Sequence, residues 1–135
     1  MSKTAEHFAQ ALFDAEQSKQ AIAPIRAALG EQASVDDAYA IQDINTKRAL
    51  NQGRRLVGRK IGLTSVAVQK QLGVDSPDFG MLFADMAYGD GEAIPAGKLI
   101  QPKVEAEIAL VLKADPSSAY LCGHYQCNRL CASCH

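Results

Sequence analysis

The spacing of apolar residues changes once along this chain, near Gly53, from a helical period to a strand period. Before that point, stretches at about 4–29 and 34–53 repeat apolar residues every three or four positions, which predicts helices. After it, 56–63 and 103–112 are rich in apolar residues with a period of two, which predicts strands. The chain is therefore expected to combine N-terminal helices with later strands.

Local signals place the ends of the two long helices. Pro24 is expected to interrupt the first helix, and Gly30 to end it. Ser34-Val-Asp-Asp37 has the pattern of a capping box and should open the second helix, which should end at Gly53. The positions expected to face a core are Phe8, Ala11, Leu12 and Ala15 in the first helix, and Ala38, Ile41 and Ile44 in the second.

Shorter elements are expected between the two strands. Residues 66–72 predict a short helix that Gly73 closes. Pro77-Asp78-Phe79-Gly80 and Asp90-Gly91 are typical turn sequences. We find no internal repeat and no low-complexity linker.

Size and charge favour a protein that acts on a small molecule. The chain has 135 residues, enough for one ordinary domain, and a formal net charge of −1 with mixed signs. No basic stripe indicates nucleic acid, and no polybasic run indicates a membrane surface. The N-terminus lacks the apolar core of a secretory signal, and no segment has membrane-spanning length, so a cytoplasmic location is expected.

The segment Lys-Val-Glu-Ala-Glu-Ile-Ala-Leu-Val-Leu at 103–112 places two acids in an apolar strand. Glu105 and Glu107 lie on one face, about 6.5–7 Å apart along the strand. Two buried carboxylates repel each other and need a partner, and a hard divalent cation such as Mg²⁺ or Mn²⁺ would neutralise them. The alternative is an edge strand whose glutamate face is solvated.

Lys60 and Asp78 are further candidates with simpler alternatives. Lys60 shares its strand face with Gly58 and Gly62, so its ammonium has open space in which to contact an anion or carry a proton; it could also be an ordinary surface lysine on a bent strand. Asp78 stands in the predicted Pro-Asp-Phe-Gly turn, where an aspartate often only bonds its own backbone.

Three stretches together resemble a known family. They are VGRKIGLTS (57–65), QLGVDSPDFGMLFADM (71–86) and QPKVEAEIALVL (101–112). In order and spacing they are similar to the 2-keto-4-pentenoate hydratases, also called 2-hydroxypentadienoate hydratases, of the fumarylacetoacetate hydrolase superfamily. The similarity extends to AIAPIRAAL and AYAIQDIN in the predicted helices and covers roughly residues 5–115.

The resemblance implies an α+β fold, with N-terminal helices and part of a mixed, rolled β-sheet that is incomplete here. It implies one Mg²⁺ or Mn²⁺ held by three carboxylates. Glu105 and Glu107 match the family's Glu-x-Glu pair, Lys60 the lysine of its Lys-[Ile/Val]-Gly-Leu-Thr motif, and Asp78 the aspartate of its Pro-Asp-[Phe/Tyr]-Gly motif. The third metal carboxylate follows a motif resembling VLPALE, which is absent from this chain.

The implied reaction is the hydration of 2-hydroxypenta-2,4-dienoate to 4-hydroxy-2-oxopentanoate in the catabolism of aromatic compounds. The metal would act as a Lewis acid, and Lys60 and Asp78 would supply the acid and the base, in an order that stays open. Alternatives are a 4-oxalocrotonate-type decarboxylase, a C–C hydrolase of the same superfamily, or a non-catalytic fragment. Family members are usually homo-oligomers.

All four cysteines lie near the end of the chain, in a segment without a clear period. The chain is therefore expected to divide into a hydratase-like part, 1–115, and an aberrant tail, 116–135. Cys131-Ala-Ser-Cys134-His135 matches the pattern for attachment of c-type haem, but no export signal supports that attachment. Zinc is a chemical alternative, although the spacing fits no strong template. The possible ligands are Cys122, His124, Cys127, Cys131, Cys134 and His135.

A shift of reading frame offers a third explanation for the tail. Possible codons of 122–134, read one base along, permit Val-Asp-Ile-Ile-Ser-Ala-Thr-Ala-Tyr-Val-Leu-Pro-Ala. This peptide resembles the family's sequence just before the third metal ligand. We therefore expect the tail to be a frameshift product and the 135-residue chain to show little or no hydratase activity. Sequencing of the encoding DNA tests this.

Overall fold

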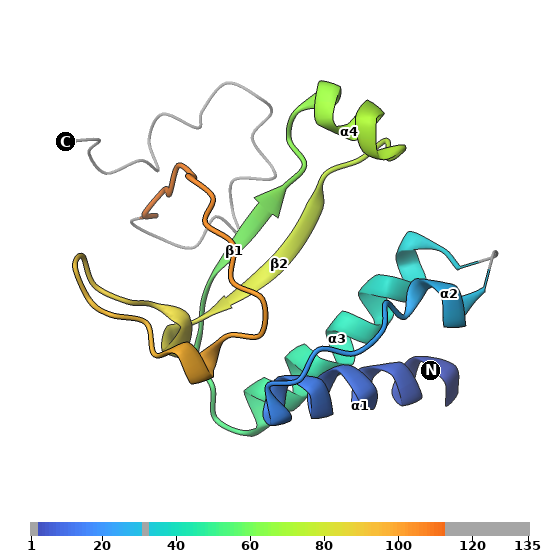
Figure 1. Cartoon of the computed structure of the whole chain (residues 1–135), viewed down its shortest axis with the longest axis horizontal. Helices are drawn as coiled ribbons and strands as arrows, with labels where there is room; N and C mark the ends of the chain where they lie inside the picture. Colours follow the sequence, from blue (N-terminus) through green and yellow to red (C-terminus); the bar gives the residue numbers. More distant parts are fainter. Residues whose placement is uncertain (1–2, 31–32, 113–135) are drawn as a thin grey trace. The chain divides into compact units, whose positions relative to one another are not determined.

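The computed structural model describes residues 3–30 and 33–112 and has an α+β architecture (Figure 1). Helices come first, and a two-stranded antiparallel sheet follows them. The predicted combination of N-terminal helices with strands is confirmed. The elements are α1 (Lys3–Ser18), α2 (Arg26–Leu29), α3 (Val35–Asn51), β1 (Leu56–Gly62), α4 (Val66–Leu72), β2 (Asp78–Phe83) and the 3₁₀ turns η1 (Ala84–Met86) and η2 (Ala96–Lys98).

The first helix is shorter than its sequence pattern predicts. α1 ends at Ser18, well before Pro24, and α2 is a single turn that ends before Gly30. Lys19, directly after α1, has a left-handed backbone with φ 57°. The Ser18 hydroxyl also donates to the Asp14 carbonyl, one turn back along the helix, at 2.7 Å. The break in the helix therefore begins earlier than predicted. Pro24 lies inside the non-helical stretch between α1 and α2, and Gly30 follows α2 as predicted.

The capping box of α3 is confirmed. Ser34 is the N-cap, and its hydroxyl oxygen accepts from the Asp37 backbone N–H at 3.1 Å. In return, the Asp37 carboxylate accepts from the Ser34 backbone N–H at 2.9 Å and from its hydroxyl. These hydrogen bonds, the backbone one first, lower the pKa of Asp37. At the other end, Gly53 with φ 84° follows the helix as predicted.

A small core lies between α1 and α3, which pack side by side (Figure 1). Phe8, Ala9 and Ile41 form its buried centre, and Ile44 packs against it. The predicted core positions are thus largely confirmed. Leu12 and Ala38 are the exceptions, because both are exposed.

Polar contacts complete this helix pair. Asn45 Nδ2 donates to the Ala9 carbonyl at 2.9 Å. The Arg48 guanidinium lies over the Phe13 ring, 4.3 Å from its centroid, and donates to Gln10 Oε1 at 2.8 Å. These cation–π and hydrogen-bond contacts join α3 to α1 and fix its position against that helix.

The strands β1 and β2 form an antiparallel ladder. Lys60 lies opposite Gly80, and Gly62 lies opposite Asp78. A bulge interrupts the register between Leu56 and Gly58. The Pro-Asp-Phe-Gly sequence was predicted to be a turn, but its last three residues begin β2. This prediction was wrong because the ladder with β1 supplies backbone partners that outweigh the local turn tendency.

The connection between the strands follows its sequence signals. α4 spans Val66–Leu72, and Gly73 ends it in the left-handed conformation with φ 70°, as predicted. Leu63, just after β1, also has a positive φ of 55°. The buried Gln69 side chain donates to the Leu63 carbonyl at 2.5 Å and so joins α4 to the end of β1.

Backbone contacts divide the chain into two units, Met1–Pro102 and Lys103–His135. Within the second unit the structure describes only 103–112. The strand predicted there was wrong for the described residues: 103–111 carry no strand, and Leu112 alone makes a β-bridge. The cysteines and both tail histidines lie outside the described residues. In the described part, no helix is both long and apolar enough to cross a membrane.

Candidate active site

The strand pair brings Lys60 and Asp78 together. Lys60 Nζ donates to Asp78 Oδ1 at 2.6 Å, and both side chains are about half exposed, 48% and 52%. The register explains the contact: because Gly62 faces Asp78 and Gly80 faces Lys60, the lysine and the aspartate are diagonal neighbours on one face. Two residues that the sequence singled out separately therefore form one charged pair.

Glycines make room for this pair. A Cβ on Gly62 would collide with Asp78 Oδ1 and lie 2.9 Å from Lys60 Nζ. A Cβ on Gly80 would lie 3.1 Å from Lys60 Cε and 3.2 Å from its Cγ. Both distances are tighter than ordinary contacts. The sequence predicted open space for a ligand beside Lys60, but the structure fills the space at Gly62 with the Asp78 carboxylate and the Lys60 ammonium. Gly80, on the opposite strand, makes room for the Lys60 side chain.

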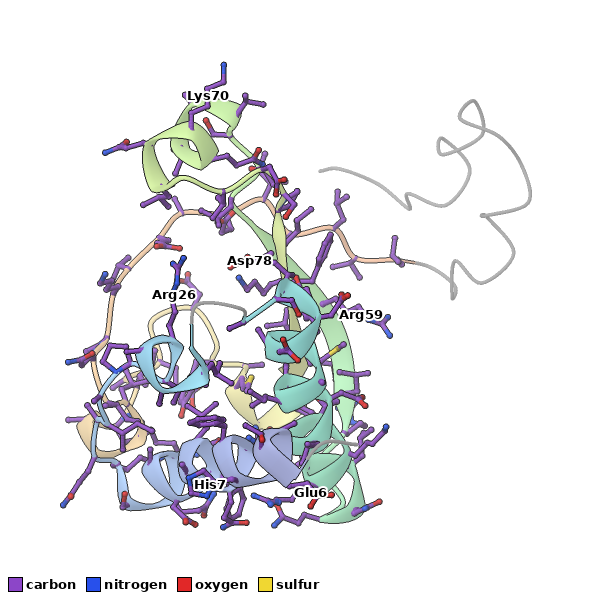
Figure 2. All side chains as sticks on the ribbon, turned by 90° about the vertical axis from the view of Figure 1, so that its right-hand side faces the viewer. Glu6, His7, Arg26, Arg59, Lys70 and Asp78 are labelled. Carbon is purple, nitrogen blue, oxygen red and sulfur yellow. The ribbon has the colours of Figure 1, made fainter. Side chains whose placement is uncertain are left out.

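The other face of the strand pair has a different character. Figure 2 shows Asp78 and Arg59 on opposite sides of the ribbon, as strand alternation requires. Ile61 and Phe79 are cross-strand partners beside Arg59 and Met81, and both are about half exposed. Only the Lys60 face therefore combines charge with glycine-made space.

Two side chains of α3 bind the start of β2. The Tyr39 hydroxyl oxygen accepts from the Phe79 backbone N–H at 3.1 Å. Gln42 Nε2 donates to the Phe79 carbonyl at 3.1 Å. Sequence analysis missed both residues. The only available signal was their spacing, three apart and so on one side of a helix, which does not indicate what they bind.

Arg54 fastens the far end of β2. Its Nε lies 3.0 Å from Asp85 Oδ2, and its Nη2 donates to Asp85 Oδ1 at 3.1 Å. Its guanidinium lies over the buried Phe83 ring at 4.5 Å, and its Nη1 is 3.7 Å from Glu16 on α1. The hydrogen bonds from Arg54 are the main cause that lowers the pKa of Asp85.

The predicted metal ligands lie in the second unit of the chain. Glu105 and Glu107 are both exposed, and so are their apolar neighbours: Val104 is 101% exposed and Ile108 92%. Their carboxylates are the oxygen donors that Mg²⁺ and Mn²⁺ prefer. Among the described residues, no group of three or more acids, histidines or cysteines could hold a metal ion. The donor chemistry fits such an ion, with two of the three expected ligands.

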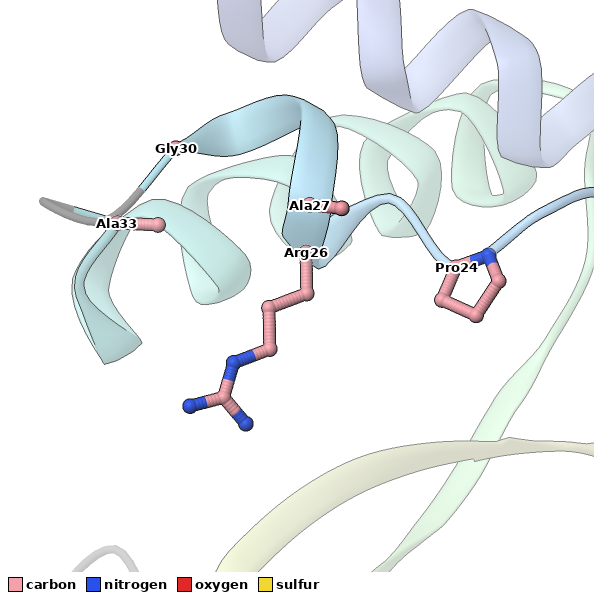
Figure 3. A pocket seen from close by; sticks show the side chains of 5 residues that line it. All are labelled: Pro24, Arg26, Ala27, Gly30 and Ala33. Carbon is pink, nitrogen blue, oxygen red and sulfur yellow. The ribbon is translucent and has the colours of Figure 1, made fainter.

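A hollow of about 640 Å³ lies elsewhere, beside α2 (Figure 3). Its lining contains one charged side chain, Arg26, which extends away from the short helix in the figure. None of the predicted site residues lines it. The remaining lining residues are Pro24, Ala27, Gly30 and Ala33.

Comparison with curated proteins finds close relatives. The chain is 69% identical over 96 residues to 2-keto-4-pentenoate hydratase 1 of Dechloromonas aromatica, covering 71% of this chain and 36% of the relative. It is 62% identical over 110 residues to 2-keto-4-pentenoate hydratase of Paraburkholderia xenovorans, covering 82% and 40%. It is 47% identical over 105 residues to 2-hydroxypent-2,4-dienoate hydratase of Pseudomonas putida, covering 77% and 47%. No family model matches the chain.

Solved structures give a consistent result. The fold resembles 4-oxalocrotonate decarboxylase from Pseudomonas putida G7 complexed with magnesium and adipate, with TM-score 0.56 and 31% identity over 60% of this chain and 30% of that one. The same enzyme complexed with calcium and acetate matches with TM-score 0.57 and 30% identity, covering 62% and 32%.

These matches agree with the resemblance seen in the sequence motifs. The chain spans about two fifths of the length of the curated relatives, between 36% and 47% for those named above. Over the matched residues, this chain is a homologue of the 2-keto-4-pentenoate hydratases.

Proposed function

We propose that this chain carries part of the active site of a divalent-metal-dependent hydratase acting on 2-hydroxypenta-2,4-dienoate. The observation that carries the proposal is the Lys60–Asp78 pair, 2.6 Å apart on a strand face where glycines leave room for both side chains. The names of the relatives that are 62–69% identical supply the reaction and the substrate class. The product would be 4-hydroxy-2-oxopentanoate.

Lys60 and Asp78 would move the protons. Water addition to a dienol needs one group that takes a proton from water and another that gives a proton to carbon. In an ammonium–carboxylate pair, Asp78 is the acceptor and Lys60 the donor, so we assign Asp78 as the base and Lys60 as the acid. Since both side chains are about half exposed, water and a small substrate can reach them.

Glu105 and Glu107 would hold the metal ion. Their carboxylates suit a hard divalent cation, and their alternate spacing places both on one side when the segment is extended. Such an ion supplies Lewis-acid polarisation of the oxygens of an oxo-acid. Completion of the usual three-carboxylate set would need one further acid.

A second candidate reaction is decarboxylation of a 4-oxalocrotonate-like substrate. The fold similarity to 4-oxalocrotonate decarboxylase favours it, because both activities need a metal-bound 2-oxo acid. The hydratase relatives are roughly twice as similar in sequence, 62–69% against 30–31%. We therefore place hydration first.

The test is a chimera in which residues 1–112 replace the corresponding residues of the Dechloromonas aromatica relative. We expect the chimera to hydrate freshly prepared dienol in the presence of Mg²⁺ or Mn²⁺, measured as the loss of dienol absorbance. We expect it to act poorly on 4-oxalocrotonate. The parent protein is the positive control, and the chimera with chelator is the negative one. A folded, metal-loaded chimera without hydration would contradict the proposal, and preference for 4-oxalocrotonate would establish the second candidate.

The type of sheet and the oligomeric state are also proposals. We infer that the strand pair is part of a mixed, rolled sheet of the fumarylacetoacetate hydrolase type and that the working protein is a homo-oligomer. The fold similarity to the decarboxylase supports the first statement. Sedimentation of the chimera beside its parent would test the second.

A further inference from the structure

We infer that Tyr39 and Gln42 are positioning residues for the Lys60–Asp78 pair, an inference that rests on the function proposed for that pair. In the described structure, neither side chain hydrogen-bonds to the side chain of Lys60 or Asp78. Both act on Phe79, the residue that directly follows Asp78 along β2. Through its hydrogen bonds to Phe79, α3 would determine the positions of the Asp78 carboxylate and the Lys60 ammonium.

The two hydrogen bonds hold the two peptide groups on either side of Phe79. Tyr39 accepts from the Phe79 N–H, which belongs to the peptide that joins Asp78 to Phe79. Gln42 donates to the Phe79 carbonyl, which belongs to the peptide that joins Phe79 to Gly80. The first peptide orients the Asp78 backbone. The second orients Gly80, against which the Lys60 side chain lies.

These bonds also give hydrogen-bond partners to backbone groups on the unpaired edge of β2. Among the described residues, β2 pairs with β1 on one side only, and the Phe79 N–H and carbonyl point to its other side, where α3 binds them. An unpaired strand edge leaves such groups to water and lets the backbone shift. Side-chain partners on a neighbouring helix reduce that freedom at the position next to Asp78.

α3 provides a firm base for this contact. Ile41, between the two residues in sequence, is 2% exposed and belongs to the core shared with α1. A helix anchored in a packed core holds its side chains more precisely than a loop does. Small displacements matter for proton transfer, since misplacement by about 1 Å costs about 100-fold in rate.

The experiment uses the full 135-residue chain with Tyr39→Phe, Gln42→Met and the double variant. Tyr88→Phe and Gln71→Met are matched controls, because they remove the same groups from residues that have no hydrogen bond to Phe79 among the described residues. Hydrogen exchange at the Phe79 amide reports the Tyr39 bond. We expect Tyr39→Phe to raise that rate about fivefold, the equivalent of one typical hydrogen bond, with the Ile41 amide unchanged.

The geometry of the pair is read from acylation of the Lys60 amine under limiting reagent, by mass spectrometry. Lys70, exposed on α4, is the internal reference, and Asp78→Asn gives the reactivity of Lys60 without its partner. A carboxylate at hydrogen-bond distance shields the amine, so we expect the double variant to raise Lys60 reactivity more than about twofold, towards the Asp78→Asn value. The control variants should leave it at the wild-type level.

Each outcome decides the inference. A rise at Lys60 relative to Lys70, with the folded state retained by circular dichroism, supports positioning. Unchanged Lys60 reactivity with faster Phe79 exchange overturns it, because α3 would then bind the strand without placing the pair. If the double variant unfolds, the two single variants decide by the same criterion. The readout needs no turnover, so an inactive hydratase chimera would refute the proposed function without touching this result.

Discussion

The strand pair and the segment at 103–112 differ in how their charged residues are supported. Lys60 and Asp78 stand on a ladder, contact each other at 2.6 Å and have glycines opposite them. Glu105 and Glu107 lie in a segment without strand pairing at 103–111, and every described residue of that segment is exposed. The fold therefore sets the distance between Lys60 and Asp78, whereas only the sequence spacing relates Glu105 to Glu107.

The difference shows what a strand needs besides its own pattern. β1 and β2 are joined through the short helix α4, so their pairing closes a short loop at a small entropic cost. Residues 103–112 alternate just as clearly, but no strand of the described part pairs with 103–111. Alternation predicts which residues share a face, while the ladder depends on a partner.

The largest expected effect is a loss of kcat when Lys60 or Asp78, the pair held on the strand ladder, is replaced. In the hydratase chimera, Lys60→Met or Asp78→Asn should lower kcat by about 10²–10⁴-fold, because each removes one partner in proton transfer. Steady-state kinetics on the dienol measures this, with Arg59→Gln on the opposite face as the control. Near-normal kcat for both variants would show that the pair is a surface ion pair only.

The next prediction concerns Glu105 and Glu107, the pair without strand pairing. In the chimera, Glu105→Gln or Glu107→Gln should weaken Mn²⁺ binding by at least about 10–100-fold, since even groups behind metal ligands have effects of that size. Calorimetric titration with Mn²⁺ measures it.

The 135-residue chain sharpens this prediction. There the same two substitutions should leave the thermal midpoint unchanged, because both side chains are exposed. A loss of stability in the chain would mean that the glutamates are already packed, and unchanged Mn²⁺ affinity in the chimera would remove them as ligands.

A smaller effect is expected from filling the glycine space. Gly62→Ala should destabilise the strand pair by about 1–3 kcal/mol, the usual cost of overpacking, because the new Cβ collides with the Lys60–Asp78 contact. Urea unfolding of the 135-residue chain measures it. Gly97→Ala is the control, since its Cβ would meet nothing within 4 Å. Equal stability of the two variants would show that the pair moves aside freely.

The smallest effect is a pH dependence at the end of β2. Because Arg54 lowers the pKa of Asp85 in the folded chain, its contribution to stability is complete above the ordinary aspartate value of about 3.9. That contribution is lost as pH falls through the lower folded value. Asp85→Asn should therefore reduce the thermal midpoint slightly at about pH 7 and less at about pH 3. An equal reduction at both values would assign the effect to something other than ionisation.

Much of the helical part could be predicted because its signals are local. Ser34 and Asp37 form the capping box, and Gly73 closes α4, as their sequence neighbours indicate. The end of α1 could not be predicted in the same way. Lys19 adopts a positive φ, which its residue type does not suggest.

The site shows the same division. Sequence motifs singled out Lys60 and Asp78, but the turn predicted for Asp78 is a strand, and only the register places its carboxylate beside the ammonium. Tyr39 and Gln42 had no chemical signal, since a tyrosine and a glutamine on a helix can bind many partners. Their role depends on Phe79, far along the chain.

By itself, the sequence determined the capping box of α3, the glycines that follow α3 and α4, the alternation of β1 and the residues that carry charge. These features depend on backbone preferences and on neighbours a few positions away. Tertiary structure decided which strand pairs with which, that Lys60 meets Asp78, and that α3 binds the edge of β2. Such contacts join distant residues, and they form only where the chain buries enough surface and pairs enough backbone groups to offset the entropy of bringing them together.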